Sequence, residues 1–216
     1  MLNTPVLARY LGTVSLFHRS TFHSLNHLAH LYLSGNDPLV ITGNFMGDAV
    51  KGSDLGAYAA GLQRGIRLHR AIDSFTDQHE ITRQGRARLR AHTGRYAGVV
   101  LDLFYDHLLA SDWQAHHAEP LPQFSQRMYA LLQQRIALMP VRITHMLPYM
   151  VAGDWLRNYA HIDGLAGALH GLSQRARQGG AMLGAERVLV AHREVFRLEF
   201  AAFFADLRLH VKQQEE

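Results

Sequence analysis

The sequence predicts an all-α protein, and three features support this class. Apolar residues recur at three- and four-residue spacing, as at Leu101, Phe104, Tyr105, Leu108 and Leu109, which is the period of a helix with one buried face. No segment shows the sustained alternation of a half-buried strand, or a hairpin turn flanked by such alternation. Proline and glycine residues divide the chain into pieces of helical length.

These pieces define the expected helices, which in order span about 24–34, 37–50, 56–79, 82–110, 122–139, 142–160, 161–178 and 186–210. Each of the first four contains one of the polar clusters described below. The last contains an aromatic run that is typical of core packing, namely Val195, Phe196, Phe200, Phe203 and Phe204. The glycine-rich segment RQGGAMLGAE at 177–186 is the loop that we expect to be most mobile.

Length and composition indicate one domain. A chain of 216 residues is long enough for a single sizeable core, and a hydrophobic content of 48% argues against disorder. The absence of cysteine excludes disulfides, a thiolate metal site and a cysteine nucleophile. No apolar run approaches the ~18 residues of a membrane span, and residues 1–24 lack the early basic region and cleavage site of a signal peptide. Cytoplasm is therefore the default compartment.

The formal charge of +4 is unevenly distributed. The stretch 81–101 contains five arginines and no acid, and the stretch 120–153 contains Arg127, Arg135 and Arg142, again with no acid. Such a surface favours an acidic partner, which by charge alone could be nucleic acid, anionic lipid or an acidic protein. The alternative is that scattered arginines only keep the protein soluble.

Four polar clusters interrupt otherwise apolar helices: NHLAHL (His27, His30), GNFMGDAVKG (Asn44, Asp48, Lys51), LHRAIDSFTDQH (His69, Asp73, Asp77, His79) and LDLFYDHLLA (Asp102, Asp106, His107). In the last cluster, two carboxylates lie four residues apart among apolar neighbours. Burying both without a partner would be costly, so a cation is expected nearby. The glycine-rich second cluster lacks the spacing of a phosphate-binding P-loop.

The cation could be a metal ion or arginine. Histidine with carboxylate is a ligand set that suits Mn, Fe and Zn. Six residues from four helices are candidates to converge on such an ion: His30, Asp48, His69, Asp73, Asp102 and Asp106. The alternative is a set of structural ion pairs between Asp73, Asp102 and the arginines. Of the 15 histidines, those outside the four clusters are interpreted as surface or capping residues.

Five motifs in order and spacing, NHLAHLYLS, GNFMGDAVKG, GIRLHRAIDSFTDQH, AGVVLDLFYDHLLASDW and DWLRNY, resemble the acyl carrier protein phosphodiesterase family from about Asn26 to the last helix. The resemblance implies removal of 4'-phosphopantetheine from holo acyl carrier protein, which would be the acidic partner, with no nucleic acid or membrane span involved. It also implies an all-α, metal-dependent domain resembling the HD phosphohydrolase fold without its His-Asp dyad, because Gly47 precedes Asp48.

Carried onto this chain, the resemblance implies a metal centre of His30, Asp48, His69, Asp73, Asp102 and Asp106. The cofactor would be a divalent metal, Mn²⁺ before Mg²⁺ or Fe²⁺. We predict His69, His107 and Asp73 as catalytic residues, with His69 or His107 protonating the leaving serine oxygen. Lys51, Arg67 and Arg70 are the predicted substrate-binding residues, with Arg64 near them in sequence. We expect Asp77 to support the centre or to pair with an arginine, and His79 to lie beyond it.

This chain differs from the family pattern at Tyr32 and has additional residues at its N-terminus. Tyr32 stands where family members often have a second histidine, and its hydroxyl could replace that histidine as a hydrogen-bond donor. The family usually begins near Leu25, so residues 1–24 are predicted to be an extension, either poorly ordered or a misassigned start, before a phosphodiesterase domain at 25–212. Two other functions stay open: a metal phosphohydrolase of nucleotides or other small phosphodiesters, and a non-enzymatic binding module for an acidic protein.

Overall fold

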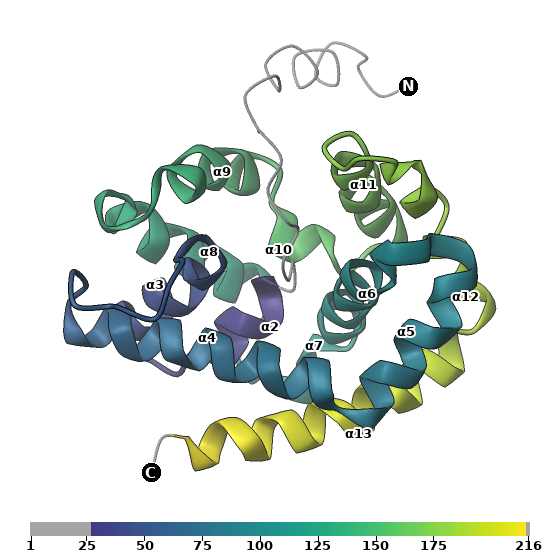
Figure 1. Cartoon of the computed structure of the whole chain (residues 1–216), viewed down its shortest axis with the longest axis horizontal. Coiled ribbons are helices and arrows are strands. Elements are labelled where there is room, and N and C mark those ends of the chain that lie inside the picture. Colours follow the sequence, from purple (N-terminus) through teal and green to yellow (C-terminus); the bar gives the residue numbers. More distant parts are fainter. Residues whose placement is uncertain (1–26, 215–216) are drawn as a thin grey trace.

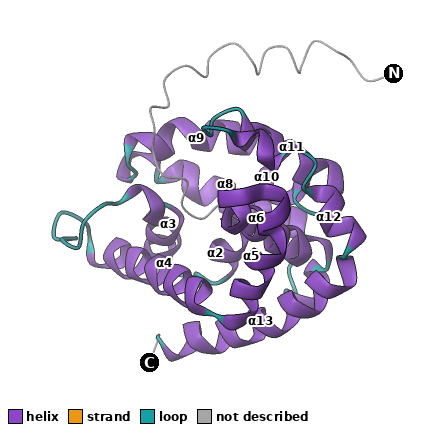
Figure 2. Ribbon diagram, turned by 45° about the vertical axis from the view of Figure 1, so that its right-hand side comes forward, coloured by secondary structure: helices purple, strands orange, loops and turns teal. Residues whose placement is uncertain are grey.

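The computed structural model describes residues 27–214, and within this range every regular element is a helix (Figures 1 and 2). The α-helices are α2 (His27–Tyr32), α3 (Pro38–Phe45), α4 (Ala60–Gln78), α5 (Glu80–Thr93), α6 (Ala97–Ser111), α7 (Trp113–His116), α8 (Leu121–Gln134), α9 (Val141–Ala152), α10 (Trp155–Asn158), α11 (Ile162–Ser173), α12 (Glu186–Ala191) and α13 (Arg193–Gln213). Short 3-10 helices lie at Gly47–Ala49 (η1), Gly94–Tyr96 (η2), Ile136–Leu138 (η3) and Gly179–Met182 (η4). No helix in the described range is long and apolar enough to cross a membrane.

Helices α3 and α4 pack backbone against backbone. A Cβ atom on Gly65 of α4 would lie 2.2 Å from the carbonyl oxygen of Val40, and one on Gly43 of α3 would lie 2.3 Å from the carbonyl oxygen of Leu62. Both distances are shorter than any atomic contact allows, so only glycine permits this approach. The contact fixes the part of α4 that carries His69 and Asp73 beside the end of α3.

Helix α2 packs against α3 and α6, and α13 packs along α4, α5 and α6. The short helix α2 lies near the middle of the molecule, between α3 and α6 (Figure 1). The long helix α13 runs along α4, α5 and α6 and buries Phe196, Phe200, Phe203 and Phe204 against them. Phe196 packs edge-on against Phe104 of α6, with ring centroids 5.3 Å apart. The prediction that this run is core is confirmed for its four phenylalanines, whereas Val195 is 42% exposed.

The all-α prediction is confirmed for the described residues, but five predicted helices are broken. The segments 37–50 and 122–139 each end in a separate 3-10 helix, η1 and η3. The segment 82–110 is divided by η2 between α5 and α6, the segment 142–160 by a left-handed residue at Asp154 (φ 43°), and the segment 186–210 at His192. Buried positions continue at helical spacing across η2, through Leu89, Thr93, Tyr96 and Val100, but Met150 and Leu156 lie six positions apart and Leu189 and Phe196 seven. The predicted loop at 177–186 contains η4. The predicted extension at 1–24 lies outside the described residues and stays a prediction.

Candidate metal centre

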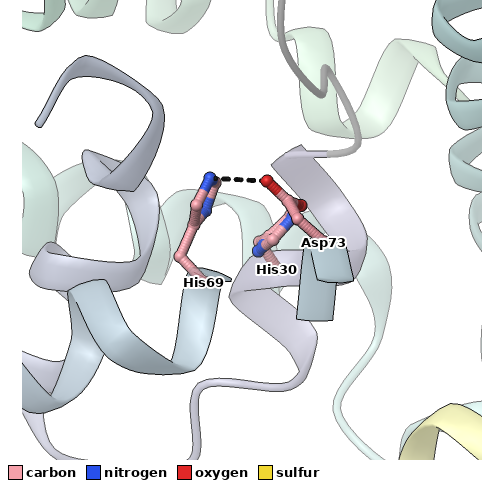
Figure 3. A group of neighbouring side chains, drawn as sticks. All are labelled: His30, His69 and Asp73. Carbon is pink, nitrogen blue, oxygen red and sulfur yellow. Dashed lines mark ion pairs between the residues drawn. The ribbon is translucent and has the colours of Figure 1, made fainter. Parts of the chain in front are cut away.

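Three side chains from two helices place their ligand atoms within 4.8 Å of one another: His30 from α2, and His69 and Asp73 from α4. The two α4 residues lie one turn apart on one face, as the four-residue spacing predicts. Nε2 of His69 lies 3.2 Å from Oδ2 of Asp73, and Nε2 of His30 lies 3.2 Å from Oδ1 of the same carboxylate. The two imidazole rings stack with centroids 4.3 Å apart. Figure 3 shows the three side chains directed toward one another.

Asp48 joins this group through His69. Its Oδ1 lies 3.3 Å from Nε2 of His69, and it comes from η1, the 3-10 turn that follows α3. The residue before it, Gly47, makes the approach possible: a Cβ atom there would lie 2.3 Å from Cγ of His69. Glycine at 47 therefore leaves the space that the His69 ring occupies.

The orientation of His30 is fixed from the side away from the carboxylates. Its Nδ1 lies 2.7 Å from the side-chain oxygen of Asn44, a fully buried residue of α3. The amide nitrogen of Asn44 donates to the His30 carbonyl and to the Ser34 hydroxyl, so the oxygen is the atom that faces the ring. Nδ1 of His30 must then carry a proton, so Nε2 is the ring nitrogen that faces Asp73 and could bind an ion.

The charges in the group are strongly coupled. Burial opposes the charged form of His69, but Asp48 and Asp73 outweigh burial and raise its pKa to about 9. Burial likewise raises the pKa of Asp73, yet the two imidazoles bring it below its usual value. A proton on His69 thus holds the carboxylates together in the metal-free protein, in the place where a cation would act.

The donor set fits a divalent metal ion. His30 Nε2 and both ring nitrogens of His69 are buried and have no hydrogen-bond partner of acceptable geometry in the described structure, although carboxylate oxygens lie 3.2 to 3.3 Å from the two Nε2 atoms. Ligands bound to one ion at about 2.1 Å lie roughly 3.0 to 3.4 Å apart at octahedral or tetrahedral angles. The side chain of Asp73 is 28% exposed, so this group has an open side.

Two of the predicted metal and catalytic residues make other contacts. Asp106 is fully buried and accepts hydrogen bonds of 2.9 Å from the backbone N–H groups of Leu28 and Ala29. It therefore caps the N-terminus of α2 and attaches that helix to α6. Burial raises the pKa of Asp106 to about 8, although both N–H donors favour its charged form. His107 places Nδ1 2.8 Å from the Tyr159 carbonyl oxygen, and burial lowers its pKa.

Asp102 is half-buried and lies outside the three-residue group. Burial first, and then the negative charges of Asp73 and Asp106, raise its pKa well above the usual value. Asp102 is thus close enough to Asp73 to be repelled by it. Asp77 forms an ion pair of 2.8 Å with Arg86, which is one of the two roles expected for it. His79 begins α5 and lies 3.3 Å from Asp206, beyond the centre as expected.

Of the predicted substrate-binding residues, Lys51 lies in the loop after η1 and Arg70 contacts that loop. Arg70 donates to the backbone carbonyls of Gly52 and Val50, at 2.7 Å and 3.3 Å. Arg67 donates to Gln63, and Lys51 is exposed. Arg64, also named from the sequence, instead pairs with Asp37 at 2.7 Å. Arg70 thus holds the loop in place, while the positively charged side chains of Arg67 and Lys51 are exposed to solvent.

Tyr32 lies away from the centre. Its hydroxyl donates to the His116 carbonyl at 2.9 Å, and its ring packs against Trp113 and Phe204. It therefore does not supply a hydrogen bond to the metal ligands.

Sequence reasoning assigned no role to two residues that border the centre. The sequence pattern could have identified Asn44 as a site residue, because Asn44 lies in the same polar cluster as Asp48. His27 is buried, its Nε2 has no partner among the described residues, and burial lowers its pKa to about 4. The charges of Asp48, His30 and His69 also act on it, which places it beside the group.

Fold and site together define a class: a helical domain in which histidines and carboxylates from separate helices form a buried centre that can hold a metal ion. The family model described as acyl carrier protein phosphodiesterase matches residues 25–207, and the chain belongs to this family. A protein of Pectobacterium atrosepticum named acyl carrier protein phosphodiesterase is 31% identical over 192 residues, which cover 88% of this chain and all of that protein.

Other relatives agree. The acyl carrier protein phosphodiesterase of Serratia proteamaculans is 28% identical over 194 residues, and that of Yersinia pestis is 27% identical over 192 residues; both matches cover 88% of this chain and the whole relative. No solved structure matches this chain.

Proposed function

We propose that this protein hydrolyses the phosphodiester bond between 4'-phosphopantetheine and the serine of holo acyl carrier protein, giving the apo form. Membership of the family supplies the substrate class. The observation that carries the proposal is the convergence of His30, His69 and Asp73 at a partly open, buried centre. The proposed place of action is the cytoplasm.

In this proposal His30, His69 and Asp73 bind a divalent cation, with Asp48 as a further oxygen donor. Mixed imidazole and carboxylate ligands suit Mn²⁺, with Mg²⁺ and Fe²⁺ as alternatives. When bound, such an ion neutralises phosphoryl oxygens and lowers the pKa of water toward neutrality. Burial first, and then the charges of Asp73 and Asp106, raise the pKa of Asp102, and a cation here would offset both effects, so Asp102 is the next residue that we assign to the centre.

Protein groups supply the remaining requirements. The serine oxygen needs a proton as it leaves, and we assign this role to His107 rather than to His69, because His69 is committed to Asp48 and Asp73. The contact with the Tyr159 carbonyl is made by Nδ1–H of His107 as donor, so its Nε2 must take up a proton before it can give one. Lys51 and Arg67 offer positive charge to the substrate phosphate, and Arg70 holds the loop that carries Lys51.

We also infer that the helical arrangement is a variant of the HD phosphohydrolase fold. Supporting this inference are the all-helical domain and metal donors that come from separate helices. The dyad that names that class is absent, because Gly47 precedes Asp48.

The test is incubation of purified protein and holo acyl carrier protein with Mn²⁺, with and without chelator, followed by intact-mass analysis of the carrier. We expect loss of the phosphopantetheine mass only with metal, and no conversion by Asp73→Asn. A matched control is Asp77→Asn, which lies one turn further along α4 and pairs with Arg86 instead. An intact carrier across several divalent metals would contradict the proposal, and turnover of small phosphodiesters alone would favour a small-molecule phosphohydrolase.

A further inference from the structure

One face of α9 and the turn before it expose large apolar side chains. Val141 is 69% exposed, Tyr149 50% and Leu138 44%. Val141, His145 and Tyr149 follow one another at four-residue spacing, and all three are exposed, so they form a line along one side of the helix. Exposed apolar side chains that gather on one helix face are typical of an interaction surface.

The same region carries unneutralised positive charge. No aspartate or glutamate occurs between Pro120 and Gly153. The Arg135 guanidinium donates to the Leu131 carbonyl and the Gln134 side chain, and within residues 27–214 no carboxylate pairs with Arg135 or Arg142. This surface, which we call the α9 face, consists of Arg135, Leu138, Val141, Arg142, His145 and Tyr149. It combines apolar area with positive charge.

The α9 face lies on the side of the molecule that includes α2, the helix of His27 and His30. Arg142 is half-buried in the first turn of α9, and its charge is one of those that act on His27, the residue one turn before His30 on α2. Figure 1 shows α9 at the edge of the molecule, on the same side of α4 as α2 and α3. A partner bound along α9 would therefore lie on the side of α4 from which α2 brings His30 to the centre.

We propose that the α9 face is the docking surface for an acidic protein whose contact region combines carboxylates with apolar side chains. This inference rests on the proposed function, and the partner is then the carrier protein substrate. We choose an acidic protein as the partner because its negative charge complements the positive charge of the α9 face. Residues 1–26 contain arginines and histidines but no acid, so they do not complement the face. A second set of exposed apolar side chains, Val190, Val195 and Leu198, lies beside an arginine, Arg197, that Glu194 already neutralises, so it suits an acidic partner less well.

The test is binding of apo acyl carrier protein, the proposed product, at low ionic strength by isothermal titration calorimetry. Because no bond is broken, binding is measured separately from chemistry. We expect Val141→Asp and, independently, Arg135→Glu to weaken binding about tenfold or more, and wild-type binding to weaken as salt rises. The matched control is Leu198→Asp, which changes an apolar side chain of similar exposure on α13, and it should bind like the wild type.

Circular dichroism and metal content establish that each variant is folded and has an intact centre. Equal binding by Val141→Asp, Leu198→Asp and wild type would overturn the docking proposal, while conversion of the holo carrier by the wild type would leave the proposed function standing. A wild-type dimer that Val141→Asp dissociates, seen by light scattering, would also overturn it, since the face would then join two copies. Failure of the wild type to convert the holo carrier would instead contradict the function.

Discussion

Nδ1 of His30 lies 2.7 Å from the side-chain oxygen of Asn44, and this contact determines which nitrogen of the ring faces the centre. Both residues are buried, and the Asn44 amide is itself held by the His30 carbonyl and Ser34. The ring is therefore oriented before any ion binds. A ligand held in its binding orientation loses less conformational entropy on binding, so Asn44 should contribute to metal affinity without touching the ion.

Replacing Asn44 tests this role. Asn44→Ala removes the acceptor for Nδ1–H, so the His30 ring can rotate and change tautomer. We expect Mn²⁺ affinity to fall about 10- to 100-fold, measured by calorimetry. Ser125→Ala is the control, because Ser125 is also buried and hydrogen-bonded, but on α8. Unchanged affinity in Asn44→Ala would show that the ring is held by its other contacts.

Substitutions of Asp106 distinguish a role as the cap of α2 from a role as a metal ligand. As the cap of α2, Asp106 can be replaced by asparagine, whose side-chain oxygen still accepts a backbone N–H, so we expect Asp106→Asn to keep its metal affinity. Asp106→Ala leaves two buried N–H groups without partners and should lower the free energy of unfolding by about 1 to 3 kcal/mol, measured by urea denaturation. Loss of metal by a stable Asp106→Asn variant would make this residue a ligand after all.

Gly47 tests the steric basis of the site. A methyl group at 47 would lie 2.3 Å from Cγ of His69, so Gly47→Ala must displace the ring. We expect at least a roughly tenfold loss of Mn²⁺ affinity and a lower melting temperature. Gly167→Ala is the control: its methyl group would meet no atom within 4 Å, and alanine favours the helix α11 in which it lies. A fully metal-binding Gly47→Ala protein would show that η1 can move aside.

Metal binding should depend on pH through His69. In the metal-free protein its pKa is raised from 6.5 to about 9, so at neutral pH a proton must leave when the ion binds. Affinity should therefore rise with pH up to about 9, by at most about tenfold per unit, with proton release detectable by calorimetry in buffers of different ionisation enthalpy. The same raised pKa stabilises the metal-free fold most below pH 6.5, and this contribution is lost as the pH rises through about 9. A pH-independent affinity would contradict this coupling.

The sequence predicted the helical class and the core of the site for the same physical reason. Helical spacing places His69 and Asp73 on one face without any knowledge of the fold, and His30 interrupts an apolar helix in the way that a buried functional residue does. Asp106 interrupts an apolar helix in the same way, yet its contacts are with backbone groups 77 and 78 residues away in sequence. Such long-range capping leaves no local pattern, and neither does the change of direction at Asp154.

Anomalous diffraction from crystals grown with Mn²⁺ tests the central claim most directly, because it locates the ion without reference to activity. We predict an anomalous peak enclosed by Nε2 of His30, Nε2 of His69 and the carboxylate of Asp73, which disappears in crystals of Asp73→Asn. A peak held by Asp102 and Asp106 without these three residues, or no ordered ion at the centre at saturating Mn²⁺, would contradict the account.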